Sequence, residues 1–133
     1  MPTPAFLDTS YVVRYLTGDP PGMAERAAQV IDSDEVLLLS ELVLLETAYV
    51  LGSFYKMSRP DIVDILMELV QRQNLRLATV SKPRVLQALI LCRNSKRNSF
   101  ADVLIWAQAR ESDAEGIYTF DRRFPSEGIA LHR

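Results

Sequence analysis

The feature that most limits how this chain can fold is its regular alternation of short apolar runs with longer segments of helical spacing. Leu37, Leu38 and Leu39 form one such run, and Gly116 to Phe120 forms another. The segments between the runs carry apolar residues three or four positions apart, behind helix-starting residues such as Ser40 and Ser58. Strands that alternate with helices form mostly parallel sheets covered on both faces. The pattern therefore predicts an α/β fold with four to five strands, at 5–7, 36–39, 75–79, 116–120 and, more briefly, 129–131.

The predicted helices cover 9–16, 23–31, 41–56, 59–73, 82–92 and 100–111. With 133 residues, 48% of them hydrophobic and 24% charged, we expect one domain, 1–133, with its own core. No apolar run approaches a membrane span, and the first residues lack a signal-peptide pattern. The single cysteine and single histidine exclude an internal disulfide and a Cys/His zinc site. These features suit the cytoplasm, and they mean that any metal ion must be held by oxygen atoms.

Two carboxylates directly follow predicted strands. Asp8 comes after Ala5 to Leu7, and Asp121 comes after the run that ends at Phe120. In open α/β sheets, ligands bind outside the carboxyl ends of the strands, so both residues stand where such a sheet keeps its chemistry. Taken alone, Asp8 could simply cap the following helix and Asp121 could simply close a turn.

Two further carboxylates fall on apolar faces of predicted helices. The helical neighbours of Glu46 are apolar, and the residues three, four and seven positions after Asp102 are apolar as well. A carboxylate in such surroundings is costly to bury unless it is paired or binds a metal. By contrast, Asp61, Asp64 and Glu68 share one polar helical face, as solvated acids do. Asp102 could also be a helix-start acid favoured by the helix dipole.

The four carboxylates can converge if Asp8 and Asp121 lie on neighbouring strands. Clustered carboxylates repel one another, so such a cluster needs cations. An all-oxygen, carboxylate-rich site selects Mg²⁺ or Mn²⁺, and an ion held this way suits metal-assisted phosphoryl chemistry.

The positive charge is concentrated in one part of the chain. The net charge is −2, yet residues 69–101 carry seven basic side chains and no acidic one. This block predicts a polyanionic partner, although a solvated basic surface is the alternative. The best candidates for phosphate contacts precede the helix that bears Asp102. They are Arg93, Lys96 and Arg97, with Arg14, Arg122 and Arg123 next.

With these motifs in place, the chain resembles the PIN-domain (PilT N-terminal) ribonucleases, and most of all the VapC-type toxins of toxin–antitoxin pairs. The resemblance covers the whole chain and is carried by the ordered set FLDTS, SELVLLETAYVL, FADVLIWAQA and IYTFDRRF. It implies a three-layer α/β/α fold. It also implies that a catalytic, metal-binding quartet is supported by small hydroxyl residues, Thr9 and Thr119. The quartet would be Asp8, Glu46, Asp102 and Asp121.

The resemblance implies a Mg²⁺- or Mn²⁺-dependent endoribonuclease that cuts single-stranded or looped RNA and leaves a 5′-phosphate and a 3′-hydroxyl. It also implies a homodimer and a cognate antitoxin whose tail blocks the site. Phe54, Tyr55 and the helix at 62–69 are candidates for the dimer surface. Two alternatives stay open: a non-catalytic interaction module with this fold, and another phosphate-handling α/β protein. A phosphatase of that kind should show Asp-x-Asp after the first strand, whereas Asp8 is followed by Thr9 and Ser10.

Overall fold

The structure is a computed structural model that describes residues 4–95 and 97–133. One sheet of five strands lies at its centre, in the order β3-β2-β1-β4-β5. Every neighbouring pair of strands is parallel. The strands are β1 (Ala5–Leu7), β2 (Leu37–Leu39), β3 (Leu75–Leu77), β4 (Ile117–Tyr118) and β5 (Leu131–His132). The predicted α/β class and parallel sheet are confirmed.

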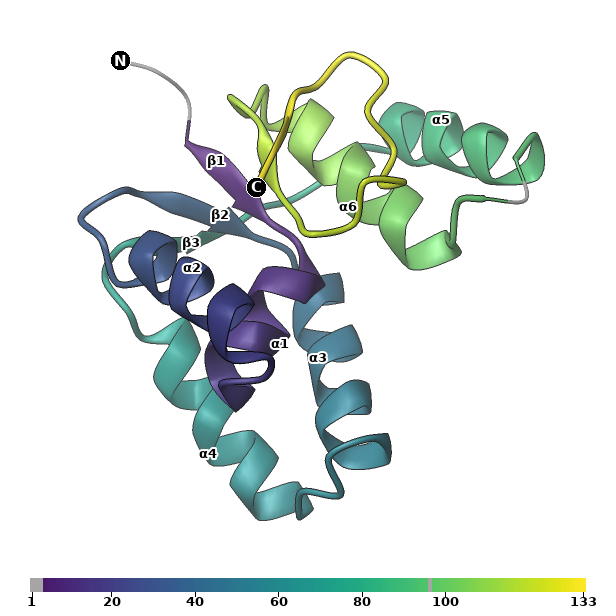
Figure 1. Cartoon of the computed structure of the whole chain (residues 1–133). Coiled ribbons are helices and arrows are strands. Elements are labelled where there is room, and N and C mark those ends of the chain that lie inside the picture. Colours follow the sequence, from purple (N-terminus) through teal and green to yellow (C-terminus); the bar gives the residue numbers. More distant parts are fainter. Residues whose placement is uncertain (1–3, 96) are drawn as a thin grey trace.

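In the part of the chain that the structure describes, six helices flank this sheet, and each corresponds to a predicted helix. Figure 1 shows their arrangement. Helices α5 and α6 pack together above the sheet in the view of Figure 1, whereas α1 to α4 lie below it. Within the described residues, no helix is long and apolar enough to cross a membrane. The bounds of the helices are α1 (Thr9–Thr17), α2 (Pro21–Ile31), α3 (Glu41–Ser53), α4 (Arg59–Val70), α5 (Lys82–Arg93) and α6 (Phe100–Glu111).

Two predicted helices are longer than the observed ones. Helix α3 ends at Ser53 rather than Lys56, and Lys56 has a positive φ of 58°, which no helix continues. Helix α4 ends at Val70 rather than Gln73, because the chain must turn to enter β3 at Leu75. Helical spacing alone does not reveal either turn.

The parallel register brings separate segments of the chain to one edge of the sheet. Leu7 of β1 is aligned with Tyr118 of β4, and the Asp8 amide donates to the Tyr118 carbonyl oxygen over 2.9 Å. Asp8 and Thr119 therefore leave the sheet next to each other. Leu39 ends β2 at the same edge, and Ser40 follows it as the N-cap of α3.

Aromatic stacking holds helix α1 against the segment that follows β4. Tyr11 is fully buried, and its ring stacks on that of Phe120 at a centroid distance of 4.3 Å with an angle of 10° between the ring planes. Gly18 is the C-cap of the helix: its amide donates to the Arg14 carbonyl oxygen, and its positive φ of 72° turns the chain out of the helix. The first turn of α1, next to Asp8, is thus held in one place.

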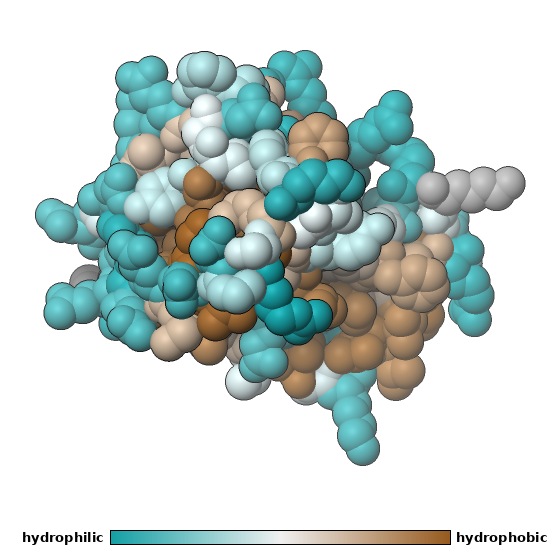
Figure 2. Space-filling model, turned by 90° about the horizontal axis from the view of Figure 1, so that it is seen from below, coloured by the Kyte–Doolittle hydropathy of each residue, from teal (hydrophilic) through white to brown (hydrophobic). Residues whose placement is uncertain are grey.

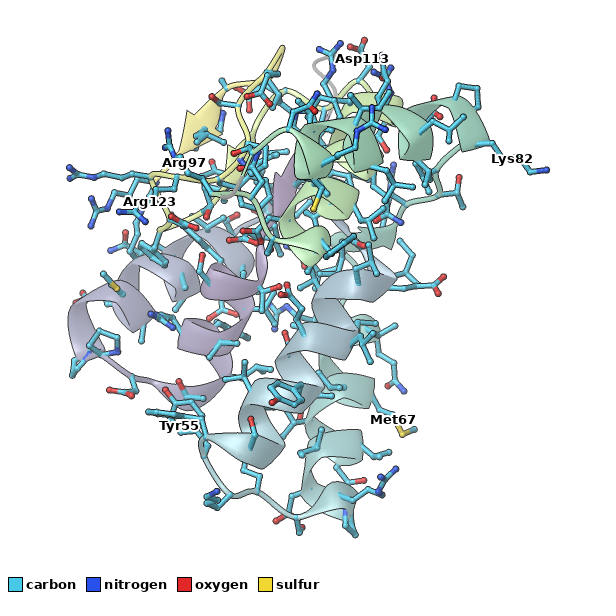
Figure 3. The ribbon with its side chains drawn as sticks, turned by 90° about the vertical axis from the view of Figure 1, so that its right-hand side faces the viewer. Tyr55, Met67, Lys82, Arg97, Asp113 and Arg123 are labelled. Carbon is cyan, nitrogen blue, oxygen red and sulfur yellow. The ribbon has the colours of Figure 1, made fainter. Side chains whose placement is uncertain are left out.

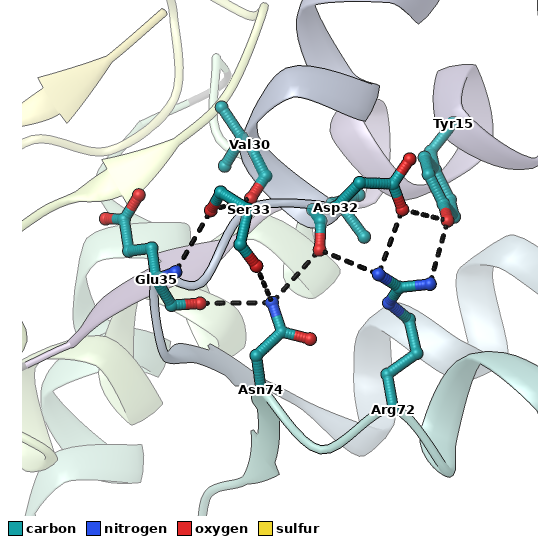
Figure 4. Close-up of polar contacts among 8 residues, drawn as sticks. Tyr15, Val30, Asp32, Ser33, Glu35, Arg72 and Asn74 are labelled. Atoms are coloured by element: carbon teal, nitrogen blue, oxygen red, sulfur yellow. Dashed lines mark hydrogen bonds and ion pairs between the residues drawn. The ribbon is translucent and has the colours of Figure 1, made fainter.

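A polar network ties the end of α2 to the segment between α4 and β3 (Figure 4). The Arg72 guanidinium pairs with Asp32 over 2.9 Å and donates to the Tyr15 hydroxyl over 3.2 Å. The Asn74 side-chain amide donates to the carbonyl oxygens of Ile31 and Glu35, each over 3.0 Å. These contacts fix the entry into β3, the edge strand.

Two hydrogen bonds hold the segment between β4 and β5 against α6. The Trp106 indole donates to the Glu127 carbonyl oxygen over 2.9 Å, and Arg110 donates to the Gly128 carbonyl oxygen over 2.5 Å. Phe124, which belongs to this segment, is buried. Helix α6 therefore carries Asp102 near its start and holds the chain that follows β4 near its end.

Candidate metal centre

Asp8 occupies the N-cap position of α1, yet the structure shows no cap hydrogen bond from its side chain within the described residues. Its Oδ2 atom instead accepts from the hydroxyls of Thr119 (2.6 Å) and Ser10 (3.0 Å). Its Oδ1 atom is buried without a hydrogen-bond partner among the described residues. Only 4% of the residue is exposed, and this burial raises the pKa of the carboxyl although the two hydroxyls lower it in part. The simple capping role considered from the sequence does not account for this arrangement.

Glu46 reaches the same place from α3. Ser40 is the N-cap of this helix, and its hydroxyl oxygen accepts from the Leu42 amide over 2.9 Å. The Thr9 hydroxyl donates to Glu46 Oε1 over 2.5 Å, which orients the half-buried carboxylate. Burial raises the pKa of Glu46, the Thr9 hydroxyl lowers it, and the nearby negative charge of Asp8 raises it further.

Asp102 comes from the first turn of α6. Its amide donates to the hydroxyl oxygen of Ser99, the N-cap, over 3.0 Å, so the helix start is fixed. Burial is the main cause that raises its pKa to about 7, followed by the negative charges of Asp8 and Glu46. At neutral pH this carboxyl is therefore only partly ionised while no cation is bound.

The three carboxylates form one cluster, with an oxygen from each lying within 4.8 Å of the others. None of the three pKa shifts has an Arg or Lys side chain among its causes. The unpartnered Asp8 Oδ1 is costly to leave buried, and a divalent cation would satisfy it. The residues therefore fit a hard cation of the Mg²⁺ or Mn²⁺ type, with Asp8, Glu46 and Asp102 as ligands.

Asp121 lies at the rim of this cluster. Its amide donates to the Thr119 hydroxyl oxygen over 3.0 Å, and its Oδ1 accepts from the Arg123 amide over 2.9 Å. Its negative charge is the last of the causes that raise the pKa of Asp102. Asp121 is exposed and stands outside the group that meets the 4.8 Å limit. Its place in a catalytic quartet stays a prediction.

The basic block does not form one surface. Arg72 is engaged in the network of Figure 4, and Arg93 and Arg97 are exposed at the end of α5 and in the loop after it. Figure 3 shows Arg97 and Arg123 on the same side of the molecule, whereas Lys82 points to the opposite side. Lys96, the third candidate of its group, lies outside the described residues.

From the sequence, Asp8, Thr9 or Ser10 could cap the first helix, and Ser10 is not among the predicted site residues, yet the structure brings it into the site. Its hydroxyl contacts Asp8, and its oxygen accepts from the Phe120 amide over 3.0 Å. These partners are 2 and 110 residues away along the chain. A hydroxyl two positions after a strand-end carboxylate was the available signal, but the second partner could not be inferred without the strand order.

Comparisons with known proteins agree with this fold. The PIN domain family model matches residues 5–127. The structure is similar to VapC20 of Mycobacterium tuberculosis, described as a sarcin–ricin loop cleaving toxin, at 22% identity and a TM-score of 0.75, over 95% of this chain and 96% of that one.

It is also similar to a chain of the DNA-bound VapBC complex of Salmonella typhimurium, at 18% identity and a TM-score of 0.69 over 98% and 97% of the two chains. For VapBC2 of Rickettsia felis, bound to a promoter DNA fragment, the values are 17% identity, 0.66, and 96% of each chain. A search of curated protein sequences found no match.

Proposed function

The chain belongs to the PIN-domain family, and from this premise we propose that it is a divalent-metal-dependent endoribonuclease and the toxin of a toxin–antitoxin pair. The observation that carries the proposal is the carboxylate cluster of Asp8, Glu46 and Asp102, with its buried and unpartnered Asp8 oxygen. A parallel sheet keeps such groups at the carboxyl ends of its strands, where substrates bind.

Each residue of the site has a definite part in the proposed reaction. Asp8, Glu46 and Asp102 would hold Mg²⁺ or Mn²⁺, which polarises the scissile phosphate and lowers the pKa of the attacking water. Thr9 orients Glu46, and Thr119 orients Asp8, through the hydrogen bonds given above. Asp121 is the solvent-exposed acid at the rim, so its carboxylate could take the proton of the water that attacks phosphorus in line. The bond from phosphorus to the 3′ oxygen would break as the new bond forms, and the 3′ oxygen would leave as a hydroxyl after taking a proton from solvent.

The RNA would approach from the side on which Arg97 and Arg123 lie (Figure 3). These two side chains come from the loop before α6 and from the segment after β4, and each segment adjoins one carboxylate of the site. Phosphate contacts of this kind give affinity without sequence specificity and are typical of single-stranded substrates. Arg72 is excluded from this role because its guanidinium is already paired with Asp32.

A cognate antitoxin is the proposed protein partner. The VapBC and VapBC2 structures to which this chain is similar are both bound to DNA, and the DNA bound by VapBC2 is a fragment from their promoter. We propose that the antitoxin of this chain covers the carboxylate cluster and stops the nuclease.

A second copy of the chain is the other proposed partner. Figure 2 shows exposed apolar side chains in two groups on this face, a larger one toward the lower right and a smaller one left of the centre. We infer that the second copy packs on the groove between α5 and α6, which has a volume of about 690 Å³. Four exposed apolar residues line it: Leu86, Leu89, Ile90 and Phe100.

The surface predicted from the sequence is less apolar than this groove. On it, Phe54, Val63 and Met67 are exposed, but α4 also exposes Asp61 and Asp64. Sedimentation should therefore give a dimer for wild type and Met67→Glu and a 15 kDa monomer for Ile90→Glu. A monomeric Met67→Glu beside a dimeric Ile90→Glu would move the interface to α4.

The proposed activity is tested on purified protein with unstructured and hairpin RNA. Cleavage should require Mg²⁺ or Mn²⁺, stop on addition of EDTA, and fall below detection in Asp8→Asn. Expression should arrest growth, and co-expression of the neighbouring open reading frame should restore it. Intact RNA under all metal conditions would reject the nuclease assignment.

A further inference from the structure

The two oxygen atoms of the Asp8 carboxylate have different surroundings. Oδ2 accepts hydrogen bonds from Thr119 and Ser10, whereas Oδ1 is buried without a partner among the residues that the structure describes. A carboxylate with one oxygen held by two donors cannot rotate freely, so its other oxygen keeps one direction. One oxygen of this carboxylate lies within 4.8 Å of carboxylate oxygens of Glu46 and Asp102, and Oδ1 is the one that hydrogen bonds leave available to a cation.

The Ser10 hydroxyl joins this carboxylate to the segment after β4. A hydroxyl has one hydrogen and two lone pairs. Ser10 gives its hydrogen to Asp8 Oδ2 over 3.0 Å, and its oxygen accepts from the Phe120 amide over 3.0 Å. Thr119 repeats this pattern, since it donates to Asp8 and accepts from the Asp121 amide. The two hydroxyl oxygens are 3.4 Å apart.

We propose that Ser10 is a positioning residue of the metal centre, which holds Asp8 Oδ1 toward the cation and fixes the backbone that carries Asp121. This inference rests on the proposed metal-dependent function. A hydroxyl that only solvated the first turn of α1 would not contact a buried carboxylate and a strand-end amide at once. Loss of an outer partner of a metal ligand typically costs about 10- to 100-fold in metal affinity.

The test is Mn²⁺ binding by calorimetry, which needs no RNA and no turnover. Ser10→Ala should bind Mn²⁺ about 10- to 100-fold more weakly than wild type. Ser10→Thr, which keeps the hydroxyl, should restore the affinity. Thr17→Ala is the matched control. Thr17 lies at the other end of the same helix, and its hydroxyl, like that of Ser10, donates one hydrogen bond and accepts one, but both of its partners are backbone atoms. It should bind Mn²⁺ like wild type.

A folding defect would not hide the answer. Ser10→Cys changes packing least and replaces the hydroxyl by a weak donor, so it should lose affinity in the same direction as Ser10→Ala. Wild-type affinity in a folded Ser10→Ala or Ser10→Cys would overturn the proposal while leaving the metal site intact. A wild-type protein that binds no Mn²⁺ would reject the metal centre itself, and this inference with it.

Discussion

Proton competition for the carboxylate cluster gives the most direct test of the proposed metal centre. The perturbation is a change of pH from 8 to 6. Burial and the charges of Asp8 and Glu46 raise the pKa of Asp102 to about 7. A cation binds the ionised carboxylate, so below this pKa it must first displace a proton. Mn²⁺ affinity should therefore fall as the pH falls.

The magnitude follows from the pKa of Asp102. The fraction ionised is about 0.9 at pH 8 and about 0.1 at pH 6, so Mn²⁺ should bind roughly tenfold more weakly at pH 6. The pKa values of Asp8 and Glu46 are raised as well, which can only add to the loss.

The stability of the metal-free protein should change in the opposite direction to metal affinity. Because the folded-state pKa of Asp102 lies above its ordinary value of 3.8, the native state binds more protons than the unfolded chain between about pH 4 and pH 7. The stabilisation that the protonated Asp102 gives to the folded state is therefore present below about pH 4 and is lost as the pH rises to about 7.

Calorimetry of Mn²⁺ binding at pH 6 and pH 8, in two buffers of different ionisation enthalpy, measures both affinity and proton release. Close to one proton should be released at pH 6, and far less at pH 8. Asp102→Asn should bind weakly with a flatter pH dependence. Equal wild-type affinity at both values, with no proton released at pH 6, would refute the reasoning from the buried cluster.

Three further outcomes are expected. At a Mn²⁺ concentration about 100-fold above its Kd, wild type should gain about 2.7 kcal/mol in its free energy of unfolding, and Asp8→Asn should lose most of that gain in a melting experiment. The pair Arg97→Gln/Arg123→Gln should flatten the slope of log affinity against log salt for single-stranded RNA by about 1.4, whereas Lys82→Gln should leave it unchanged; an unchanged slope in the pair would reject this surface. Asn74→Ala should lower the free energy of unfolding by about 0.5–1.5 kcal/mol in urea titrations, because the half-buried Ile31 carbonyl oxygen loses its donor, and wild-type stability would show that water replaces the amide.

The acidic cluster could be predicted because its members stand in apolar surroundings. Glu46 and Asp102 have apolar helical neighbours, and Asp8 follows an apolar strand, so their partial or full burial could be inferred from nearby residues. The parallel sheet could be predicted for a similar reason, since the apolar runs and helix starts agree over the whole chain. In both cases the signal lies within a few residues.

What could not be predicted depends on contacts between distant segments. Arg72 looked like part of a basic surface, but its guanidinium pairs with Asp32, which lies 40 residues earlier in the chain. This ion pair takes up the charge that would otherwise contact phosphate. Ser10 looked like a helix cap, but the strand order places Phe120 beside it. Asp121 was predicted to follow a strand directly, as Asp8 does, but β4 ends at Tyr118 rather than Phe120, and Asp121 lies exposed three residues beyond the strand, where its backbone rather than its side chain bonds to Thr119.

The strand order also determines when the site can exist during synthesis. β1 lies at the centre of the sheet, between β2, which follows it closely, and β4, which is made more than 100 residues later. A nascent chain can pair β1 with β2 and β3, but its other edge stays open until β4 leaves the ribosome. Until then Asp8 lacks the Thr119 hydroxyl, and before α6 emerges it also lacks Asp102. The proposed nuclease would therefore have no complete metal site while it is being translated. The same strand order leaves one edge of β1 unpaired during synthesis, and an unpaired strand edge is prone to aggregation.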